Sequence, residues 1–315
     1  MPIKYFPLLD HAYAMTMGTA ATNHAGVVEV EQSHYRSELA IKEQILARDH
    51  RYHVQQLPGS ELARWEALDL VLSELSRQYP AWFSYACNGV QRVWHNVLLG
   101  ERRSFVWGDC ATLPFDPLDY AGRQVQEDLL LLADAPGVPL VAGQLCFGNA
   151  WCLDDKLGLS FLAIHSPVPI FDAAIGRSAQ LLMERIKPNR PVWRTNWSVV
   201  ATDQLDYAPR WRDTVHARKL QVTPENAGER VFFRVERQGL ARLPQSRAVL
   251  FTIHTYCHPL AALNTSEARA LATTLATAPH ETLEYKGILP FIDALQSYLA
   301  ACDDVHAYVV GGADA

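Results

Sequence analysis

The chain has 315 residues, of which 49% are hydrophobic and 20% are charged, a composition typical of a globular protein of one or two domains. The formal net charge is −6, and no basic run exceeds two residues, so the sequence lacks the electrostatic pattern of nucleic-acid binding. An uncharged stretch at 135–153 is broken by prolines and glycines, and it indicates strands and turns rather than a membrane helix. No apolar signal core lies near the N-terminus, so we expect a cytoplasmic protein.

Helices are predicted in the first part of the chain. Residues 33–50 carry apolar side chains at helical spacing, and a second helix at 60–78 begins with a serine cap. A third helix is predicted at 116–136, where aspartate is followed by proline at the first helical position. The elements that follow are a strand at 138–147, a region at 151–164 that fits either helix or turns, and a helix at 175–187.

The second half is predicted to contain strands and then helices. The connection at 206–228 is long enough to be a functional loop. We expect one domain over residues 1–306 and a disordered tail at 307–315. The order of elements favours an α+β fold with one central antiparallel sheet. The expected elements are strands at 191–200, 229–237 and 247–256, and helices at 266–277 and 281–301.

Each predicted strand has one apolar side and one side with specific polar groups, because alternate side chains point to opposite faces. Arg194 in the first strand, Arg234 and Glu236 in the second, and His254 and Tyr256 in the third lie on these polar sides. Such a face either meets water or surrounds a ligand, and both interpretations stay open. The residue types favour a ligand, because arginine, carboxylate, imidazole and phenol groups bind anions or orient a substrate.

Six cysteines are present, and none forms a C-x-x-C pair. This spacing excludes the usual zinc ribbons, ferredoxin-type clusters and covalently attached haem. In a chain of this length we interpret the cysteines as free thiols.

The most informative motif is IHSPVP at residues 164–169. Its two prolines fix their own φ angles and favour extended geometry in the residues before them. The imidazole of His165, beside this stiff segment, can therefore point one ring nitrogen in a set direction, which suits a metal ligand. Alone the motif is weak, because a single histidine in an apolar run is more often a hydrogen-bonded core residue.

Seven segments in a fixed order resemble the haem-dependent oxidative N-demethylases. They are QEDL at 126–129, W at 151 with KLG at 156–158, IHSPVP at 164–169, PVWRTNWS at 191–198, ENAGER at 225–230, RVERQ at 234–238, and LP with S at 243–246. The resemblance implies a PAS-like antiparallel sheet with flanking N- and C-terminal helices. It also implies a b-type haem bound through one histidine.

The resemblance assigns roles in haem binding to residues at matching positions. His165 matches the ligating histidine and is expected to be the proximal iron ligand. Arg194, Arg234 and Arg237 match family positions and are candidates for contacts with the haem propionates.

Three further residues are candidates for the catalytic side of the haem. Glu236 and Tyr256 match positions that could line the distal pocket, and His254 stands where the family usually has arginine. A small secondary amine is mostly cationic near neutral pH, so a carboxylate would attract it and a proton acceptor would free its lone pair. Glu236, Tyr256 and His254 are each a candidate for that acceptor. The departure at His254 concerns the amine specificity more than the haem.

The implied activity is the oxidation of a small secondary amine such as dimethylamine by O2, with release of formaldehyde. The resemblance implies that electrons come from NADPH through a flavin and iron–sulfur reductase partner. The chain has no G-x-G-x-x-G or G-x-x-x-x-G-K-[ST] motif and no four-cysteine cluster, so these cofactors are expected on the partner. Neither nucleic acid nor a membrane is expected as a partner.

The main alternative is a haem-binding PAS-like sensor without turnover, because a fold does not decide function. No recognisable output segment supports that alternative. A non-haem metal site at His254 and His258 is less favoured, because the segment is predicted as a strand followed by Pro259. A serine hydrolase is disfavoured as well, since no G-x-S-x-G motif occurs.

Overall fold

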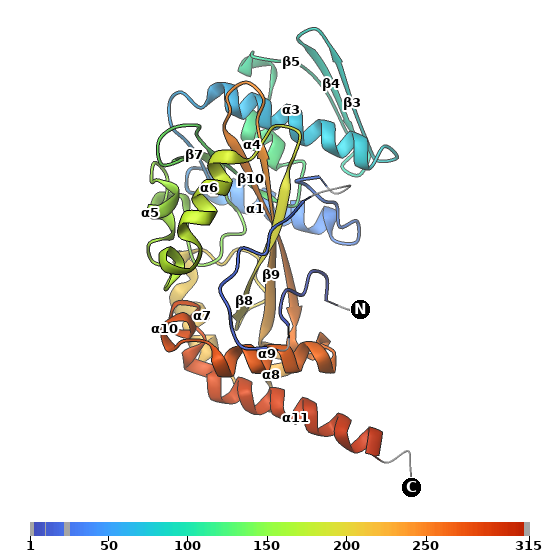
Figure 1. Cartoon of the computed structure of the whole chain (residues 1–315). Coiled ribbons are helices and arrows are strands. Elements are labelled where there is room, and N and C mark those ends of the chain that lie inside the picture. Colours follow the sequence, from blue (N-terminus) through green and yellow to red (C-terminus); the bar gives the residue numbers. More distant parts are fainter. Residues whose placement is uncertain (1–2, 10, 22–25, 312–315) are drawn as a thin grey trace.

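The computed structural model describes residues 3–9, 11–21 and 26–311 and has an α+β fold built on a seven-stranded sheet (Figure 1). Each strand pairs antiparallel with its neighbours, in the order β1-β8-β9-β10-β6-β7-β2. The predicted central antiparallel sheet is confirmed, and its PAS-like character stays a prediction. The strands are β1 (Ala20–Ala21), β2 (Val54–Gln56), β6 (Asp128–Leu132), β7 (Leu140–Gln144), β8 (Val192–Val200), β9 (Phe232–Arg242) and β10 (Val249–Pro259).

Helices surround the sheet on both sides and at one end. In Figure 1, α5 and α6 lie beside the long strands β8, β9 and β10, while α9 and α11 cross the lower end of these strands. The bounds are α1 (Tyr35–Arg48), α2 (His50–His53), α3 (Glu61–Gln78), α4 (Pro117–Gly122), α5 (Phe161–His165), α6 (Arg177–Arg185), α7 (Arg212–Lys219), α8 (Ala227–Arg230), α9 (Thr265–Thr277), α10 (His280–Tyr285) and α11 (Ile292–Gly311).

The two faces of the sheet are covered by different helices. On one side, which we call the α6 face, Leu240 of β9 and Val249 of β10 pack in one apolar cluster with Met183 of α6. On the other, the α1 face, Leu250 of β10 packs in a cluster with Tyr35 of α1. Farther along this second face, a third cluster joins β9 and β10 to α9 and α11. Because both faces are buried, every polar side chain that points from these strands needs a partner inside the protein.

A second, three-stranded sheet, which is absent from the predicted elements, stands at the upper end of the molecule in Figure 1. It consists of β3 (Phe83–Asn88), β4 (Gln91–Asn96) and β5 (Glu101–Val106) in consecutive antiparallel pairs. Phe83, Trp94 and Phe105 point from its inner side into the cluster that contains α3. Its outer side is polar and exposed, so the hydrophobic signal along these strands is weak.

The predicted helix at 116–136 is wrong beyond its first turns. Helix α4 begins where expected, with the Asp116 side chain accepting a hydrogen bond from Leu118 N at 3.1 Å, but it ends at Gly122. Strand β6 follows, and all five of its residues are buried. A central strand that is covered on both faces has a continuous apolar sequence. Such a sequence is also compatible with a buried helix, so periodicity does not distinguish the two.

The predicted loop at 206–228 is also wrong, because it contains α7 and runs into α8. The predicted helices at 175–187 and 266–277 are confirmed as α6 and α9, and the interrupted C-terminal helix is confirmed as α10 followed by α11. Helix α11 extends to Gly311, and residues 312–315 lie outside the described part of the chain. A single domain over 1–306 with a tail from 307 stays a prediction.

Candidate functional site

The imidazole of His165 is held in one orientation at the end of the short helix α5. Its Nδ1 donates a hydrogen bond to the Phe161 carbonyl oxygen at 2.7 Å. The rings of Phe161 and Phe171 lie against it, each with a centroid separation of 4.5 Å. With Nδ1 carrying the proton, Nε2 keeps its lone pair, which is the arrangement that metal-bound histidines adopt.

Burial lowers the pKa of His165 to about 4, which keeps the ring neutral near pH 7. The Phe161 carbonyl opposes this shift, while the positive charges of Lys156 and Arg194 add to it. Because only the neutral imidazole coordinates a metal, the surroundings of His165 keep it in the ligating form.

Glu236 lies on the α6 face and is held by two amide side chains. Its Oε2 accepts hydrogen bonds from Gln238 Nε2 at 2.8 Å and from Asn196 Nδ2 at 3.3 Å. The β8–β9 register pairs Asn196 with Glu236 and Arg194 with Gln238, so all four side chains share one face. A buried carboxylate held in this way can accept a hydrogen bond from a cationic ligand.

Arg194 also points from the α6 face, and its guanidinium is not fully paired. Its Nε is buried without a hydrogen-bond partner. Burial lowers the pKa of Arg194, and the charge of Glu236 raises it. A buried donor without an acceptor is costly in a folded protein, so it is an observation in favour of an anionic ligand here.

Two lysines lie near this group, and neither is marked by a motif of its own. Lys286 lies beside β8, with its ammonium 4.3 Å from the centroid of the Trp197 ring, which packs on the α1 face. The Lys156 ammonium lies 4.1 Å from the centroid of the Trp151 ring, and Lys286 donates to the Trp197 carbonyl oxygen at 2.7 Å. Burial lowers the pKa of each lysine to about 8, and Glu236 raises both. Lys156 stands within a segment of the family resemblance, but no spacing rule marks Lys286, which follows helix α10 far along the chain. We call His165, Lys156, Arg194 and Glu236 the His165 cluster.

Arg234, expected at a propionate, donates within the protein through both of its Nη atoms, while its Nε is buried without a hydrogen-bond partner. It points from the α6 face and is fully buried, and it donates to the carbonyl oxygens of Phe147, Gln204 and Leu205. These bonds tie two connecting segments to β9. The contacts therefore indicate a structural role for Arg234.

The expectation of one polar face that includes His254 and Tyr256 is wrong. The β9–β10 register pairs Thr255 with Glu236 and His254 with Arg237, so His254, Tyr256 and Arg237 point from the α1 face. The sheet lies between them and Glu236. Alternation predicts the two sides of each strand, but the register between strands cannot be derived from alternation alone.

On the α1 face these residues belong to a buried polar network. His254 Nδ1 lies 3.1 Å from Glu127 Oε1, and both side chains are almost completely buried. Tyr256 donates to Glu29 Oε1 at 2.6 Å, and burial and Glu29 together raise the pKa of Tyr256 far above its ordinary value. Tyr256 therefore stays protonated near pH 7, which does not suit a proton acceptor.

Arg237 joins the same network rather than the His165 cluster. Its Nη2 donates to the Gly26 carbonyl oxygen at 2.7 Å, and its Nε lies 3.5 Å from Glu29 Oε2. Although burial raises the pKa of Glu29, hydrogen bonds from Lys4, Tyr256 and Tyr5 lower it to about 2. Of the three arginines expected at propionates, only Arg194 lies in the His165 cluster. Arg234 Nε and Arg237 Nε and Nη1 are also buried without a hydrogen-bond partner, but Arg237 points from the opposite face of the sheet.

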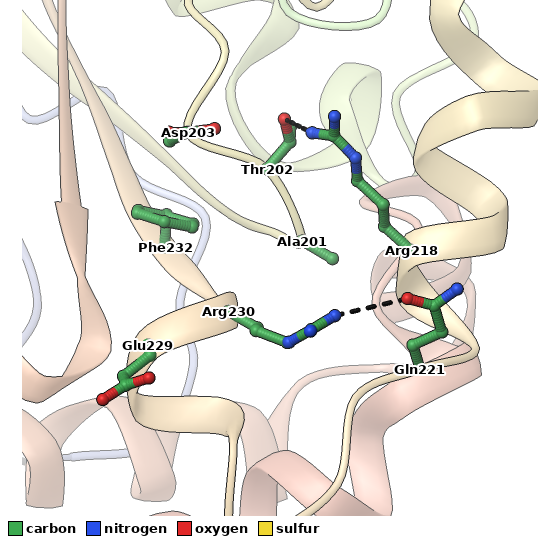
Figure 2. A pocket seen from close by; sticks show the side chains of 8 residues that line it. All are labelled: Ala201, Thr202, Asp203, Arg218, Gln221, Glu229, Arg230 and Phe232. Carbon is green, nitrogen blue, oxygen red and sulfur yellow. Dashed lines mark hydrogen bonds between the residues drawn. The ribbon is translucent and has the colours of Figure 1, made fainter.

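A separate pocket of about 270 Å³ lies between the ends of β8 and β9 and the helices α7 and α8 (Figure 2). Arg218 Nη1 donates to Thr202 Oγ1 at 2.8 Å, and Arg230 Nη1 donates to Gln221 Oε1 at 3.2 Å. This pocket shares no lining residue with the His165 cluster. Its lining residues are Ala201, Thr202, Asp203, Arg218, Gln221, Glu229, Arg230 and Phe232.

No helix in residues 3–9, 11–21 and 26–311 is both long and apolar enough to cross a bilayer. Within the same ranges, no three histidine, cysteine, aspartate or glutamate side chains are grouped so as to hold a metal ion.

A family model described as haem-dependent oxidative N-demethylase, alpha subunit-like, matches residues 18–296. The match covers most of the chain, and the protein belongs to this family. The predicted family is thus confirmed, and with it a place among haem-dependent oxidoreductases. The description as an alpha subunit indicates a system of several components.

The residues of the His165 cluster fit a haem. A porphyrin brings four nitrogen ligands of its own, so one imidazole from the protein is enough to hold the iron. His165 presents that nitrogen, and Arg194 presents a buried donor to an anionic group.

Proposed function

We propose that this protein catalyses the oxidative N-demethylation of a small secondary amine, such as dimethylamine, with O2 and a b-type haem, releasing formaldehyde. The observation that carries the proposal is the His165 imidazole, neutral and with Nδ1 occupied, near the positive charges of Lys156 and Arg194 in a chain of this family. Haem, when bound, supplies the activation of O2 and the one-electron chemistry.

Glu236 is the residue that we propose for the amine. It is the carboxylate of the His165 cluster, and two amide side chains orient it. A secondary ammonium ion binds a buried carboxylate through a charge-assisted hydrogen bond. Transfer of the ammonium proton to Glu236 leaves the neutral amine, whose carbon next to nitrogen is more easily oxidised. The protein thus selects a cation and delivers a neutral substrate.

A reductase partner supplies the electrons in this proposal, with NADPH, a flavin and an iron–sulfur cluster bound to the partner. The family description as an alpha subunit supports a partner. The sequence supports it as well, since the chain contains neither a dinucleotide-binding fingerprint nor a four-cysteine cluster.

Absorption spectroscopy of the purified protein, oxidised and reduced, tests the proposal. We expect a Soret band in the wild type and its loss or displacement in His165→Ala. The matched control His216→Ala removes an exposed histidine of α7 and should leave the spectrum unchanged. A wild type that takes up no haem would refute the proposal.

A turnover assay distinguishes the proposed enzyme from the alternative, a haem-binding sensor. With a reductase and NADPH, the enzyme should release formaldehyde in proportion to the amine added. A haem protein whose spectrum changes on gas binding, but which releases no formaldehyde from any small secondary amine, would be a sensor.

A further inference from the structure

Three acceptor oxygens on the α6 face are left without a hydrogen bond: Glu236 Oε1, Asn196 Oδ1 and Gln238 Oε1. Glu236 Oε2 accepts from both amides, Gln238 Nε2 at 2.8 Å and Asn196 Nδ2 at 3.3 Å. A carboxylate can only accept, so each amide turns its nitrogen toward Glu236 and its own oxygen away. None of the three oxygens has a partner among the described residues, and none is a buried unpaired atom, so all three are accessible to a ligand.

Gln238 combines its free acceptor with apolar surroundings. Its side chain is 8% exposed, and its cross-strand neighbour on β10 is Ile253. Ile253 belongs to the apolar cluster of the α6 face, against which Trp151 and Ile164 also pack. Small alkyl groups gain free energy when they leave water for such a surface. Gln238 Oε1 therefore lies where a ligand with both N–H and methyl groups is well accommodated.

Charge alone does not distinguish one amine from another at this position. The positive charges of Lys156 and Arg194 also lie near Glu236, since its charge raises the pKa of each. Mono-, di-, tri- and tetramethylammonium ions carry the same charge but different numbers of N–H groups. Each N–H needs an acceptor once water is excluded, and each buried acceptor needs a donor. Two acceptors held side by side therefore distinguish ammonium ions by the number of N–H groups.

We propose that Gln238 is a specificity-determining residue, which makes the site select an ammonium ion with at least two N–H groups. One N–H donates to Glu236 Oε1 and the second to Gln238 Oε1, while Asn196 is a positioning residue that holds Glu236 through Oε2. A tertiary ammonium has one N–H, so it leaves one of the two acceptors facing a methyl group. The inference rests on the proposed function, because it takes Glu236 as the residue that binds the amine.

Isothermal titration calorimetry of the full-length protein as purified tests the inference at neutral pH. The probes are the chlorides of dimethylammonium, trimethylammonium and tetramethylammonium. Wild type should bind dimethylammonium at least about tenfold more tightly than trimethylammonium, the difference expected for one charge-assisted hydrogen bond. Tetramethylammonium, which has no N–H, should bind more weakly still. This comparison needs no variant, so it holds even if a substitution impairs folding.

Gln238→Met removes the acceptor and keeps a side chain of similar length. It should bind dimethylammonium about tenfold more weakly than wild type does, and trimethylammonium at least as tightly, because methionine offers its methyl groups an apolar contact. Asn196→Ala should weaken both ions by a similar factor, since it loosens only Glu236. Gln245→Met makes the same change at an exposed glutamine between β9 and β10 and should behave as wild type.

Equal weakening of both ions in Gln238→Met would show that Gln238 only positions Glu236, and it would overturn the inference. Equal affinity of wild type for dimethylammonium and trimethylammonium would overturn it as well. Formaldehyde release from dimethylamine and trimethylamine with similar kcat/KM would also overturn it, but would leave the proposed function standing. The proposed function fails separately, if the protein takes up no haem.

Discussion

His165 Nδ1 donates to the carbonyl oxygen of Phe161, one helical turn earlier, at 2.7 Å. A five-residue helix therefore supplies both the ring and the group that orients it. Ser160 stabilises the start of this helix by accepting a hydrogen bond from Ala163 N at 3.3 Å. Pro167 and Pro169 follow and prevent the helix from continuing in its regular form. The position of Nε2 is thus determined by local backbone geometry.

The stability of the haem-free protein should decrease between pH 6.5 and pH 4 because of His165. Its pKa is about 4 in the folded state and 6.5 in the unfolded state, so the unfolded state binds the proton first as the pH falls. The contribution of His165 is therefore complete above pH 6.5 and lost as the pH falls through 4. Chemical denaturation of wild type and His165→Phe at pH 7.5, 5.5 and 4.5 measures it.

The phenylalanine variant should show a smaller loss of stability over this interval, because it keeps the ring but cannot take up a proton. His53 and His258, whose pKa values are also lowered by burial, contribute equally to both proteins and cancel in the difference. Equal pH dependence of the two proteins would contradict the burial of His165.

Local pattern was sufficient to predict the faces of each strand, but not how the strands align. Alternation correctly placed Arg194 opposite Trp193 and Glu236 opposite Val235 within their strands. Whether Glu236 shares a face with Tyr256 or with Thr255 depends on a register shift of one residue, which turn geometry and core packing decide. The same limit explains β6, where an all-buried leucine run has no periodicity to read.

Contacts between side chains from distant segments of the chain also could not be predicted from the sequence. Lys286 follows α10 and donates to the Trp197 carbonyl oxygen of β8, and no spacing rule in the sequence predicts that contact. His165, by contrast, stands in a motif whose prolines restrict the backbone, so the sequence alone marks it as a candidate ligand. Residues constrained locally are predictable, while those placed by tertiary packing require the structure.

Glu127 and His254 should be strongly coupled in stability. Both are almost completely buried, and Glu127 Oε1 also accepts a hydrogen bond from Glu29 N at 2.7 Å. Glu127→Ala should lower the free energy of unfolding by about 3–5 kcal/mol, because it leaves buried polar groups without a partner. A double-mutant cycle with His254→Ala should give a coupling energy of about 1–3 kcal/mol.

His258 provides the control for that cycle, since it points from the same face of β10 and has no contact with Glu127. The pair Glu127→Ala and His258→Ala should be additive within about 0.5 kcal/mol. Because the sheet separates this network from the His165 cluster, the Soret maximum of His254→Ala should equal that of wild type. A displaced maximum would place His254 next to the haem.

Arg242 should be essential for the attachment of α6 to the sheet. It stands at the end of β9, is almost fully buried, and donates to the carbonyl oxygens of Met183, Glu184 and Ile186 at the C-terminal end of α6. A cation at this end also interacts favourably with the helix dipole. Arg242→Met should lower the free energy of unfolding by about 2–4 kcal/mol, since it leaves buried carbonyl oxygens unpaired.

The control for Arg242 is Arg247→Met. Arg247 is about half exposed and lies 4.0 Å from Asp134, which Arg242 also contacts at 2.9 Å. Loss of an exposed ion pair should change the free energy of unfolding by less than about 1 kcal/mol. Similar losses in the two variants, measured by urea denaturation, would show that the carbonyl contacts of Arg242 contribute little.

Glu236→Gln should abolish most of the amine oxidation while leaving the haem in place. Glutamine has nearly the same shape and can still accept a hydrogen bond from Asn196, but it neither attracts a cation nor takes up the ammonium proton. Formaldehyde release should fall by about 10²–10⁴-fold, the range associated with general acid–base groups. The comparison is Tyr256→Phe, which removes a hydroxyl on the α1 face that is bonded to Glu29. Because Tyr256 stays protonated and points away from Glu236, its variant should keep formaldehyde release within a few-fold of wild type, whereas a loss as large as that of Glu236→Gln would move the amine to the opposite side of the sheet.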